Sequence, residues 1–513
     1  MKAVTADQMR AIEGRCVDAG VSLDTLMENA GRSIAEAVLS RLGGAYRKSV
    51  VVLVGPGNNG SDGYVAARHL AKRGATVVAF NLTKRPDPDN KRELAEAVGV
   101  QVVERPGETA LADASAHSDI VIDAVLGTGR ARPINQDIAR LLRAVGDNAR
   151  NIVAVDIPTG MNADTGEFDP NGLRADLTLM LGLPKIGLLA AAGQGVCGEL
   201  RLLDIGIPGG LADDFMTEAL TTELACGLLP LRSGDSNKGS FGRTLVSGGS
   251  ANYLGAPQLA AKAALRSGTG LVFLATGQPV YQLIAGRIDE AIYLPLPVNE
   301  TGAWDAKAAC SELLFHVSGM DSVLIGPGLG QSSSTVQFVE QLVRNLPETI
   351  PVVLDADALN IIARMHSWSD LLKPPAVITP HPGEMSRLLG CSVAEVQQDR
   401  VAAALDAAGK FDVTVVLKGA ATLIAAPDGR LRISPWVNSG LAKAGTGDVL
   451  AGLLAGLLAQ MPGSPFDAAS LAVYVHGLAG DIARKLHGDR GMTAIDVVSA
   501  VPYAFMELEK NSS

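Results

Sequence analysis

The 513-residue sequence predicts an α/β protein with two domains, each built on a mostly parallel β-sheet. The length is well past the size at which a single hydrophobic core keeps growing, so at least two domains are expected. Gly and Ala are abundant and only 4% of the residues are aromatic, which suits closely packed α/β layers better than β-sandwiches. Short apolar runs alternate with helical stretches along the chain, as they do in βαβ units.

Two helices are expected before the first strand. Thr5 and Gln8 form the pattern of a capping box, and residues 22–42 have apolar positions every three to four residues, which predicts a second helix. Apolar runs then predict six strands, at residues 50–54, 76–82, 120–125, 152–157, 177–181 and 200–205. Helical stretches between such strands indicate parallel crossovers.

The domain boundary is expected near residues 215–220. Residues 207–216 and 228–242 are rich in Gly, Pro, Ser and Asp, and the alternation of strands and helices pauses there. The predicted domains are therefore 1–217 and 218–513. Strands of the second domain are expected at residues 244–246, 271–275, 323–325, 352–354, 377–379 and 414–417, and three helices are expected to close the chain.

Charge and cysteine content exclude several classes of protein. The net charge of −10 is spread along the chain, which argues against nucleic acid or an anionic membrane surface as a partner. The five cysteines are scattered without any Cys-x-x-Cys pair, so neither a disulfide framework nor a zinc site is expected. The first 15 residues are charged and lack the apolar core of a signal peptide, and the most apolar helical stretch, 449–458, is about half the length of a membrane span. A cytoplasmic, soluble protein is expected.

A Gly-rich turn follows the first predicted strand, in the string GPGNNGSDG at residues 55–63. Its glycines permit close backbone approach, and the helix that follows offers free N–H groups to an anion. Such turns are also purely structural in many α/β folds. The oxygen-bearing side chains of Asn58, Asn59 and Asp62 favour a ligand site, because a turn does not need this cluster.

Two further strand ends carry similar side chains. Asp123 lies near the end of one strand and is followed by the loop at residues 127–130, while Asp156 and Thr159 follow another strand. Ligands of open parallel sheets bind outside the carboxyl ends of the strands, so these oxygens could converge on a hard cation and a phosphorylated ligand. Taken singly, either Asp is equally well explained as a helix cap or turn former.

The strings GPGNNGSDGYVAAR, DAVLGTG and VDIPTGMNADTG, with the later LPKIGL, resemble the N-terminal domain of the YjeF family, the NAD(P)H-hydrate epimerases, over about residues 5–212. The resemblance implies a Rossmann-like three-layer domain in which Asn59, Asp123 and Thr159 bind a potassium ion. It also implies contacts to the hydrated nucleotide from Asn58, Asn59, Gly60, Ser61, Asp62, Gly127, Thr128, Gly129, Arg130, Ala131, Arg132, Pro133 and Asp156. Ser61 stands where many relatives have Gly, which should only adjust the packing of the loop.

The reaction that this resemblance implies is chemically simple. The hydrate carries a hydroxyl on the carbon beside the ring nitrogen, and this carbinolamine can invert by losing and regaining hydroxide. A carboxylate such as Asp156 could shuttle the proton, and positioned acid–base catalysis contributes about 10²- to 10⁴-fold. The alternative is a non-catalytic nucleotide- or RNA-binding module, against which Asp156 argues.

The strongest signal of the second half is the string AGTGDVLAG, in which Asp448 lies in the first turn of a long apolar helix. Free N–H groups and the dipole at a helix N-terminus stabilise charge that develops in phosphoryl transfer, and a nearby carboxylate can accept a proton from the attacking hydroxyl. Asp448 could instead simply complement the helix dipole. Other predicted strand ends favour a site, since they carry polar or Gly-rich segments at residues 248–250, 326–330, 355–360, 381–384 and 418–422.

The strings LVSGGS, AALRSGTGLV, GPGLG, DADALN, TPHPGE, LKGAAT and AGTGDVLAG resemble the ribokinase-like fold and, within it, the ADP-dependent NAD(P)H-hydrate dehydratases, over about residues 225–505. The resemblance implies a doubly wound α/β domain that binds ADP through Lys418, Gly419, Ala420, Ala421, Thr422 and Gly447. It implies that Ala256, Gly330, His381 and Asp448 contact the hydrated nicotinamide nucleotide. Asn237 and Ser439 stand where relatives often have His and Pro, which puts local loop geometry in doubt.

In the mechanism implied by this resemblance, Asp448 deprotonates the ring hydroxyl, which attacks the terminal phosphorus of ADP with the help of a magnesium ion. Phosphate then leaves, so the products are AMP, phosphate and NAD(P)H. No magnesium ligand set is evident, and Glu384 is only a candidate. Together the halves are expected to epimerise the R and S forms of hydrated NADH and NADPH and to dehydrate the S form, in a homo-oligomer for which a tetramer is favoured. The alternatives are a small-molecule kinase fused to a nucleotide-binding module, or a chain in which one half is inactive.

Overall fold

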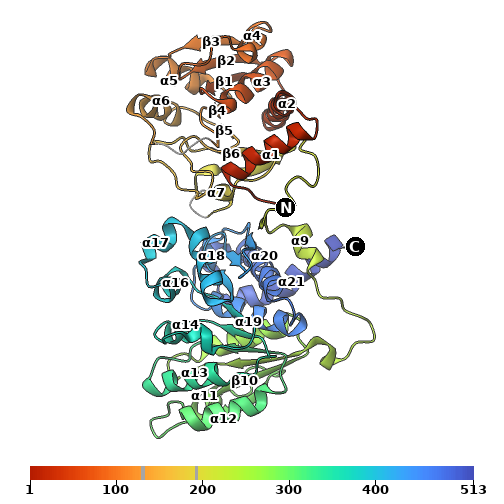
Figure 1. Ribbon diagram of the computed structural model, residues 1–513, viewed down its shortest axis with the longest axis vertical. Helices are drawn as coiled ribbons and strands as arrows, with labels where there is room; N and C mark the ends of the chain where they lie inside the picture. The colour runs from red at the N-terminus through yellow and green to blue at the C-terminus, as the bar shows by residue number, and fades with distance from the viewer. Residues whose placement is uncertain (129–132, 191–194, 513) are drawn as a thin grey trace. The chain divides into compact units, whose positions relative to one another are not determined.

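The computed structural model describes residues 1–128, 133–190 and 195–512. The chain divides into two compact units, one of residues Lys2–Thr217 and the other of residues Glu218–Ser513 together with Met1 (Figure 1). Each unit has its own sheet and its own hydrophobic core. The predicted α/β class is confirmed in both.

The first unit contains a seven-stranded, fully parallel sheet in the order β3-β2-β1-β4-β5-β6-β7. The strands are β1 (Ser49–Val54), β2 (Thr76–Asn81), β3 (Gln101–Glu104), β4 (Ile120–Ala124), β5 (Ile152–Val155), β6 (Leu177–Leu181) and β7 (Glu199–Leu203). All six predicted strands are present. The edge strand β3 was not predicted, because its two apolar residues lie between an exposed Gln and an exposed Glu.

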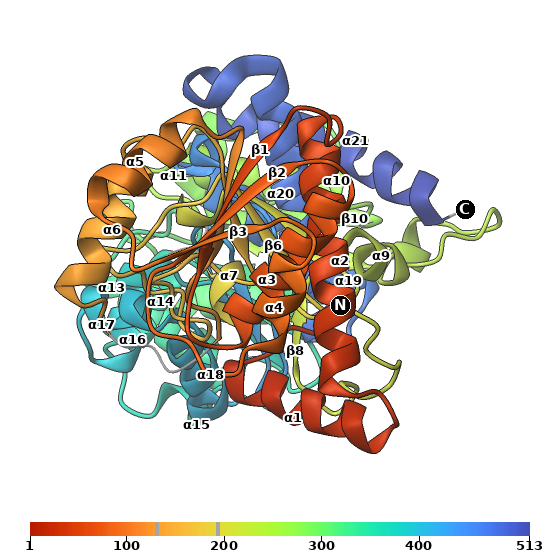
Figure 2. The ribbon, with the colours of Figure 1, turned by 90° about the horizontal axis from the view of Figure 1, so that it is seen from above.

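Helices cover both faces of this sheet. Alternate residues of β1 explain why: Val50, Val52 and Val54 pack into a core with α2 and α3, whereas Val51 and Leu53 pack into the core on the opposite face with α6. Figures 1 and 2 show α5 and α6 on one side of the strands and α2 and α3 on the other. The helices are α1 (Ala6–Asp18), α2 (Leu23–Leu42), α3 (Asn58–Lys72), α4 (Asn90–Glu96), α5 (Glu108–His117), α6 (Gln136–Gly146) and α7 (Ile186–Leu189).

The second unit contains a ten-stranded sheet in the order β11-β10-β9-β12-β13-β14-β15-β16-β17-β8. The strands are β8 (Thr217–Ala219), β9 (Arg243–Ser247), β10 (Leu271–Gly277), β11 (Ile292–Leu296), β12 (Ser322–Ile325), β13 (Val352–Leu354), β14 (Ala376–Ile378), β15 (Thr414–Leu417), β16 (Leu423–Ala425) and β17 (Leu431–Ile433). Strands β9 to β15 are parallel, and β16 and β17 add an antiparallel hairpin. The six predicted strands are all present.

Helices complete the second unit, and the three predicted at its end are confirmed. They are α19 (Thr446–Gln460), α20 (Pro465–Gly491) and α21 (Ala494–Ser512). The others are α9 (Thr222–Gly227), α10 (Gly255–Arg266), α11 (Gln278–Ile284), α12 (Ala306–Val317), α13 (Ser333–Asn345), α14 (Asp357–Ile362), α15 (Trp368–Leu371), α16 (Pro382–Leu389), α17 (Val393–Gln398) and α18 (Arg400–Phe411), with 3-10 turns η1 (Lys238–Phe241) and η2 (Ser439–Leu441). Within the described residues, no helix combines the length and the apolar character that a membrane span requires.

Close packing of α19 against α10 depends on Gly452. A Cβ atom at this position would lie 2.0 Å from the carbonyl oxygen of Ala260. We therefore expect Gly452→Ala to lower the free energy of unfolding by about 1–3 kcal/mol through overpacking, although Ala favours a helix over Gly by about 1 kcal/mol. Gly409→Ala in α18 is the matched control, because its Cβ would meet no atom within 4 Å and should stabilise the unit slightly. Urea unfolding of the two variants measures this difference, and equal effects would contradict the packing argument.

Candidate active sites

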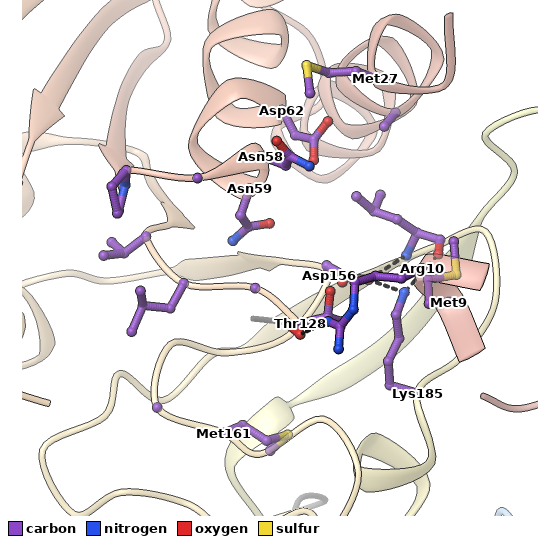
Figure 3. A pocket seen from close by; sticks show the side chains of 18 of the residues that line it. Met9, Arg10, Met27, Asn58, Asn59, Asp62, Thr128, Asp156, Met161 and Lys185 are labelled. Carbon is purple, nitrogen blue, oxygen red and sulfur yellow. Dashed lines mark hydrogen bonds and ion pairs between the residues drawn. The ribbon is translucent and has the colours of Figure 1, made fainter. Parts of the chain in front are cut away.

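The first unit contains a cavity of about 660 Å³ at the carboxyl ends of its central strands. Its walls come from the loops after β1, β4, β5 and β6 and from helices α1 and α2. Polar side chains directed toward it include Asn58, Asp62, Asp156 and Lys185 (Figure 3). A volume of this size is typical of small-molecule and cofactor sites.

Asp156 and Lys185 form a buried ion pair in this cavity. The Lys185 Nζ atom donates to Asp156 Oδ1 at 2.6 Å and to the carbonyl oxygen of Leu181 at 3.0 Å, and the lysine side chain is fully buried. Asp156 Oδ1 also accepts a hydrogen bond from the Leu181 N–H. The backbone of Asp156 has a φ of +67°, a left-handed conformation that is uncommon outside Gly. Neither carboxylate nor ammonium is therefore free to turn away from the cavity.

Lys185 was not singled out from the sequence. It follows β6 in the string LPKIGL, which contributed to the family resemblance but contains no other polar side chain. The one available signal was a lysine in an otherwise apolar segment four residues after β6, because a buried ammonium requires a partner. Nothing in the local sequence identifies that partner as Asp156, 29 residues earlier.

Asp62 is a second acidic side chain of the cavity and differs from Asp156 in its surroundings. It comes from α3, is only 9% exposed, and forms no hydrogen bond or ion pair with any residue that the structure describes. Burial raises the pKa of Asp62 well above its ordinary value, and the nearby charges of Asp156 and Glu13 act in the same direction. Burial also raises the pKa of Glu13, a cavity residue of α1.

Asp123 and Thr159 lie together beneath the cavity. The Thr159 hydroxyl donates to Asp123 Oδ1 at 2.7 Å, and the Thr159 N–H donates to Asp123 Oδ2 at 2.8 Å. Burial raises the pKa of Asp123 to about 6, although these hydrogen bonds oppose the shift. Asn59 packs against Gly127 in the neighbouring loop, and its amide nitrogen is buried without a hydrogen-bond partner among the described residues.

Asp123 and Thr159 are hydrogen-bonded to each other and to the backbone, and together with Asn59 they also supply oxygens of the kind that hold a cation. Rotation of the Asn59 amide by 180° would place an oxygen where its unpartnered nitrogen lies. The Asp123 carboxylate is buried without a basic partner among the described residues, and a nearby cation would offset the cost of its charge. Carboxylate, hydroxyl and amide oxygens are the ligands that hard cations prefer.

The other sequence-predicted residues of this site divide into three groups. Gly127, Thr128 and Pro133 line the cavity with Asn58, Asn59 and Asp62. Gly60 and Ser61 do not: Gly60 packs against the carbonyl of Gly55, and the Ser61 hydroxyl accepts a hydrogen bond from Arg85 at 3.0 Å. Gly129, Arg130, Ala131 and Arg132 lie outside the described residues.

The candidate site of the second unit is centred on the N-terminus of α19. A Cβ atom at Gly447 would lie 3.6 Å from Lys418 Nζ, so the lysine lies against the first turn of the helix. Asp448 occupies that turn and is partly buried, and its carboxylate forms no hydrogen bond with a described residue. Burial raises the pKa of Asp448 to about 7, and the charge of Asp355 adds to the shift. A carboxylate with this pKa is suited to accept a proton near neutral pH.

Lys418 connects three of the predicted strand ends. Its Nζ atom donates to Asp355 Oδ1 at 2.7 Å, after β13, and lies 3.7 Å from Glu384 Oε2, after β14. Burial opposes the charge on Lys418, yet these two carboxylates raise its pKa. The ammonium group is therefore held in its charged form beside Asp448.

Glu384, the candidate magnesium ligand, already has a hydrogen-bond partner and an ionic partner. Its Oε2 atom accepts the His381 N–H at 2.8 Å, and His381 Nδ1 in turn accepts the Gly383 N–H at 3.0 Å, which caps α16. Burial raises the pKa of Glu384 to about 7. Across the described residues, no group of three or more His, Cys, Asp or Glu side chains is placed to hold a metal ion. A magnesium ion here would have to be held largely by phosphate oxygens, as is common for Mg²⁺.

A buried arginine holds the turn at residues 418–422. Arg400 is 8% exposed and donates to the carbonyl oxygens of Ala420 at 2.6 Å, Leu417 at 3.3 Å and Lys418 at 3.4 Å. It forms no ion pair with a described residue, and burial lowers its pKa to about 10. Sequence analysis missed this residue, because Arg400 begins α18 and its partners come from a turn 17 to 20 residues later.

The remaining predicted contacts lie on neighbouring loops. The Gly330 N–H donates to Asp357 Oδ2 at 2.8 Å, and Ala256 lies beside Gly328 at the start of α10. His381 is exposed and caps its own helix. Half-buried His476, which was not predicted from the sequence, lies 2.9 Å from the carbonyl oxygen of Thr446 in the first turn of α19. Burial lowers the pKa of His476 to about 4, so its neutral ring supports the turn that carries Asp448.

Two family models match the chain, and together they span both units. Residues 23–187 match the model described as YjeF-related protein N-terminus, and residues 244–503 match the model described as NAD(P)H-hydrate dehydratase. The dehydratase model covers the strands from β9 to β17, and the N-terminal model covers β1 to β6.

Several relatives match this chain over nearly the full length of both sequences. The bifunctional NAD(P)H-hydrate repair enzyme Nnr of Thermofilum pendens is 37% identical over 520 residues, covering 100% of this chain and 97% of the relative. The enzyme of the same name from Moorella thermoacetica is 38% identical over 495 residues, covering 94% and 93%. Among solved structures, a hypothetic protein from Streptococcus mutans is 25% identical with a TM-score of 0.50, covering 57% of this chain and 100% of that one.

Proposed function

The chain belongs to the family of bifunctional NAD(P)H-hydrate repair enzymes. We propose that the cavity of the first unit and the site at the N-terminus of α19 in the second unit catalyse successive steps of one repair. The first unit epimerises the R and S forms of hydrated NADH and NADPH. The second unit dehydrates the S form with ADP, which gives NAD(P)H, AMP and phosphate. The observation that carries the proposal furthest is the unpartnered carboxylate of Asp448 in the first turn of α19, beside Lys418.

The dehydratase step follows from these groups. Asp448 accepts the proton of the ring hydroxyl, whose oxygen attacks the terminal phosphorus of ADP as the bond to the bridging oxygen breaks and AMP leaves. Lys418 and the free N–H groups of α19 stabilise the charge on the transferred phosphoryl group. The carbon–oxygen bond then breaks, phosphate leaves with the electron pair, and a proton lost from the adjacent ring carbon restores the double bond.

We further propose that residues 418–422 and Gly447 bind ADP, and that Ala256, Gly330, His381 and Asp448 contact the hydrated nucleotide. The loops that carry these residues meet around the first turn of α19 and the end of β12, which supports the assignment. A magnesium ion bound to the phosphates would neutralise part of their charge during transfer, with Asp355 and Glu384 as the nearest buried carboxylates to Lys418.

For the epimerase step, we propose that Asp156 moves the proton of the ring hydroxyl and that Lys185 holds this carboxylate in place. Six of the sequence-predicted contacts line the cavity and would surround the hydrated nucleotide: Asn58, Asn59, Asp62, Gly127, Thr128 and Pro133. Asp123, Thr159 and Asn59 fit a potassium ion, which would supply a fixed positive charge beside the loops that bind it. This charge would also offset the burial of Asp123.

Arg400 gives the ADP assignment a specific test. Because Arg400 donates to two carbonyls of the 418–422 turn and to the carbonyl of Leu417 before it, Arg400→Met should displace the turn and lower kcat/KM for ADP by up to about 10²-fold, mainly through KM. Arg400→Lys should restore part of the loss, and Lys410→Met, at an exposed position of the same helix, is the matched control. Steady-state kinetics with varied ADP measures the effect. An unchanged KM for ADP in Arg400→Met would show that this turn does not bind the nucleotide.

The complete function is tested with chemically hydrated NADH whose two epimers have been separated by chromatography. The parent chain with ADP, magnesium and potassium should convert both epimers to NADH, with one AMP and one phosphate per NADH formed. Asp156→Asn should convert only the S form, and Asp448→Asn should equilibrate the epimers without forming NADH. A parent chain that recovers only one epimer, with the other changing at its spontaneous rate, would refute the epimerase assignment. A stable phosphate ester in place of free phosphate would instead indicate a small-molecule kinase.

We also propose that the chain forms a homo-oligomer, with a tetramer favoured, and that it acts in the cytoplasm. The expected location is supported by the five free cysteines, which persist as thiols in a reducing compartment. Sedimentation velocity with and without ADP measures the oligomeric state.

A further inference from the structure

We propose that Asp62 is a second catalytic residue of the epimerase site, acting as the acid on one face of the nicotinamide ring while the Asp156–Lys185 pair acts as the base on the other. The inference rests on the proposed epimerase function of the first unit and assigns the second proton-transfer group that inversion requires. Asp62 would otherwise serve only as one of several contacts to the nucleotide.

The positions of the two carboxyls carry this inference. Asp62 comes from α3 and Asp156 from the end of β5, and both line the same 660 Å³ cavity. Figure 3 shows Asp62 on the α3 side of this space and Asp156 beside Lys185 on the other side. A flat ring that enters between them would present one face to each carboxyl group.

The hydrogen-bond partners of the two carboxyls differ in the way that an acid and a base require. Asp156 accepts from the Lys185 ammonium at 2.6 Å and from the Leu181 N–H at 3.2 Å, so its carboxylate is held by two donors. Asp62 is more than nine-tenths buried and accepts nothing from the described residues. Burial without a donor favours the protonated form, which can give its proton to a ligand.

The charged groups around Asp62 act in the same direction. Glu13 from α1 and Asp156 from β5 oppose its ionisation, while Lys185 and Lys91 of α4 favour it less strongly. The balance keeps the pKa of Asp62 raised. Lys185 is already paired with Asp156, and Lys91 is paired with Asp24, so each ammonium already has a carboxylate partner other than Asp62.

The proposed step conserves atoms and charge. Asp62 donates its proton to the ring hydroxyl, the carbon–oxygen bond breaks, water leaves, and the lone pair of the ring nitrogen forms a carbon–nitrogen double bond. A water molecule on the opposite face then adds to the same carbon and gives a proton to Asp156. The enzyme ends with Asp62 ionised and Asp156 protonated, and the same two groups with exchanged roles catalyse the reverse inversion.

This arrangement explains why one cavity needs two carboxyl groups of opposite protonation. A single carboxylate assists departure and addition only on the face that it contacts, so it accelerates exchange of the hydroxyl more than inversion of the carbon. Two groups on opposite faces allow departure from one side and addition from the other. General acid–base catalysis of this kind contributes about 10²- to 10⁴-fold per positioned group.

The test uses the full chain without ADP, so that only epimerisation is observed, starting from each purified epimer of hydrated NADH. Asp62→Asn should lower kcat in both directions by about 10²-fold or more, with a much smaller change in KM. Asp62→Glu should restore part of the rate. The alkaline decline of kcat in the parent, caused by ionisation of Asp62, should be absent from Asp62→Asn. Asp113→Asn, at an exposed position of α5, is the matched control.

The outcomes separate this inference from the function on which it rests. If the parent equilibrates the epimers and Asp62→Asn does so within about threefold of the parent rate, or changes only KM, Asp62 is a binding residue and the inference is wrong. If Glu13→Gln rather than Asp62→Asn removes the alkaline decline, the acid is Glu13. If the parent itself does not accelerate the exchange, the proposed epimerase function fails and the inference fails with it. Thermal unfolding confirms that each variant is folded.

Discussion

Replacing Asp448 with Asn is expected to lower ADP-dependent formation of NADH by about 10²- to 10⁴-fold while leaving epimerisation unchanged. The amide has the shape of the carboxylate but cannot accept the proton of the ring hydroxyl, so the attack on phosphorus loses its base. The initial rate of NADH absorbance increase measures the loss. Asp428→Asn, in an exposed turn of the same unit, is the control. An Asp448→Asn variant that repairs hydrated cofactor at the parent rate would contradict the assignment of the base.

The Asp448→Asn variant also tests how activity and stability are expected to depend on pH. Because Asp448 has a pKa of about 7, kcat/KM of the parent should rise as the pH increases through 7 and the carboxylate ionises. The raised pKa means that the folded state binds this proton more tightly than the unfolded state, so ionisation of Asp448 reduces stability as the pH rises through 7. Asp448→Asn should therefore be at least as stable as the parent at pH 8, with a smaller difference at pH 5. Thermal unfolding at the two pH values measures this.

Lys185→Met is expected to abolish epimerisation and to destabilise the first unit by about 3–5 kcal/mol. The substitution leaves the Asp156 carboxylate buried without the ammonium that lies 2.6 Å away, in a cavity that already contains Asp62 and Glu13. Urea dependence of hydrogen exchange at the amides of β5 and β6 reports the stability of this unit separately from that of the other.

A double-mutant cycle provides the control for this prediction. Adding Asp156→Asn to Lys185→Met removes the unpaired charge, so stability should recover while epimerisation stays absent. If Lys185→Met alone is as stable as the parent, the ion pair does not hold the Asp156 carboxylate in place. In that case the proposed division of roles between Asp156 and Asp62 would lose its structural basis.

Sequence patterns predicted the fold well wherever a strand was a continuous apolar run. All twelve predicted strands are present, and most of them are mainly apolar because they are buried on both faces of a parallel sheet, whereas β7 at the sheet edge is mostly half-buried or exposed. The missed strands have other causes. Strands β16 and β17 form a short antiparallel hairpin outside the alternation of strands and helices, β8 contains one apolar residue, and β11 contains a proline and is mostly half-exposed. Such segments become strands only because a neighbouring strand is available for pairing.

Site residues were predictable when the chain placed them at strand ends, and they were not when they act through a distant partner. Asp123, Asp156 and Asp448 each follow a glycine-rich or apolar signal that local sequence displays. Lys185, Arg400 and His476 have no such signal, since each is defined by a carbonyl or carboxylate brought close by folding. Buried cations and neutral imidazoles of this kind are visible only after the tertiary contacts are known.

The left-handed backbone of Asp156 also constrains how this site can change during descent. Asn tolerates that conformation as readily as Asp, and a single nucleotide substitution converts an Asp codon to an Asn codon. A duplicated gene could therefore lose the proton-transfer group in one step while keeping the backbone of the pocket, although Lys185 would then lack its carboxylate partner. The descendants would retain the nucleotide and release it unaltered, so binding proteins without catalysis are the expected by-products of this architecture.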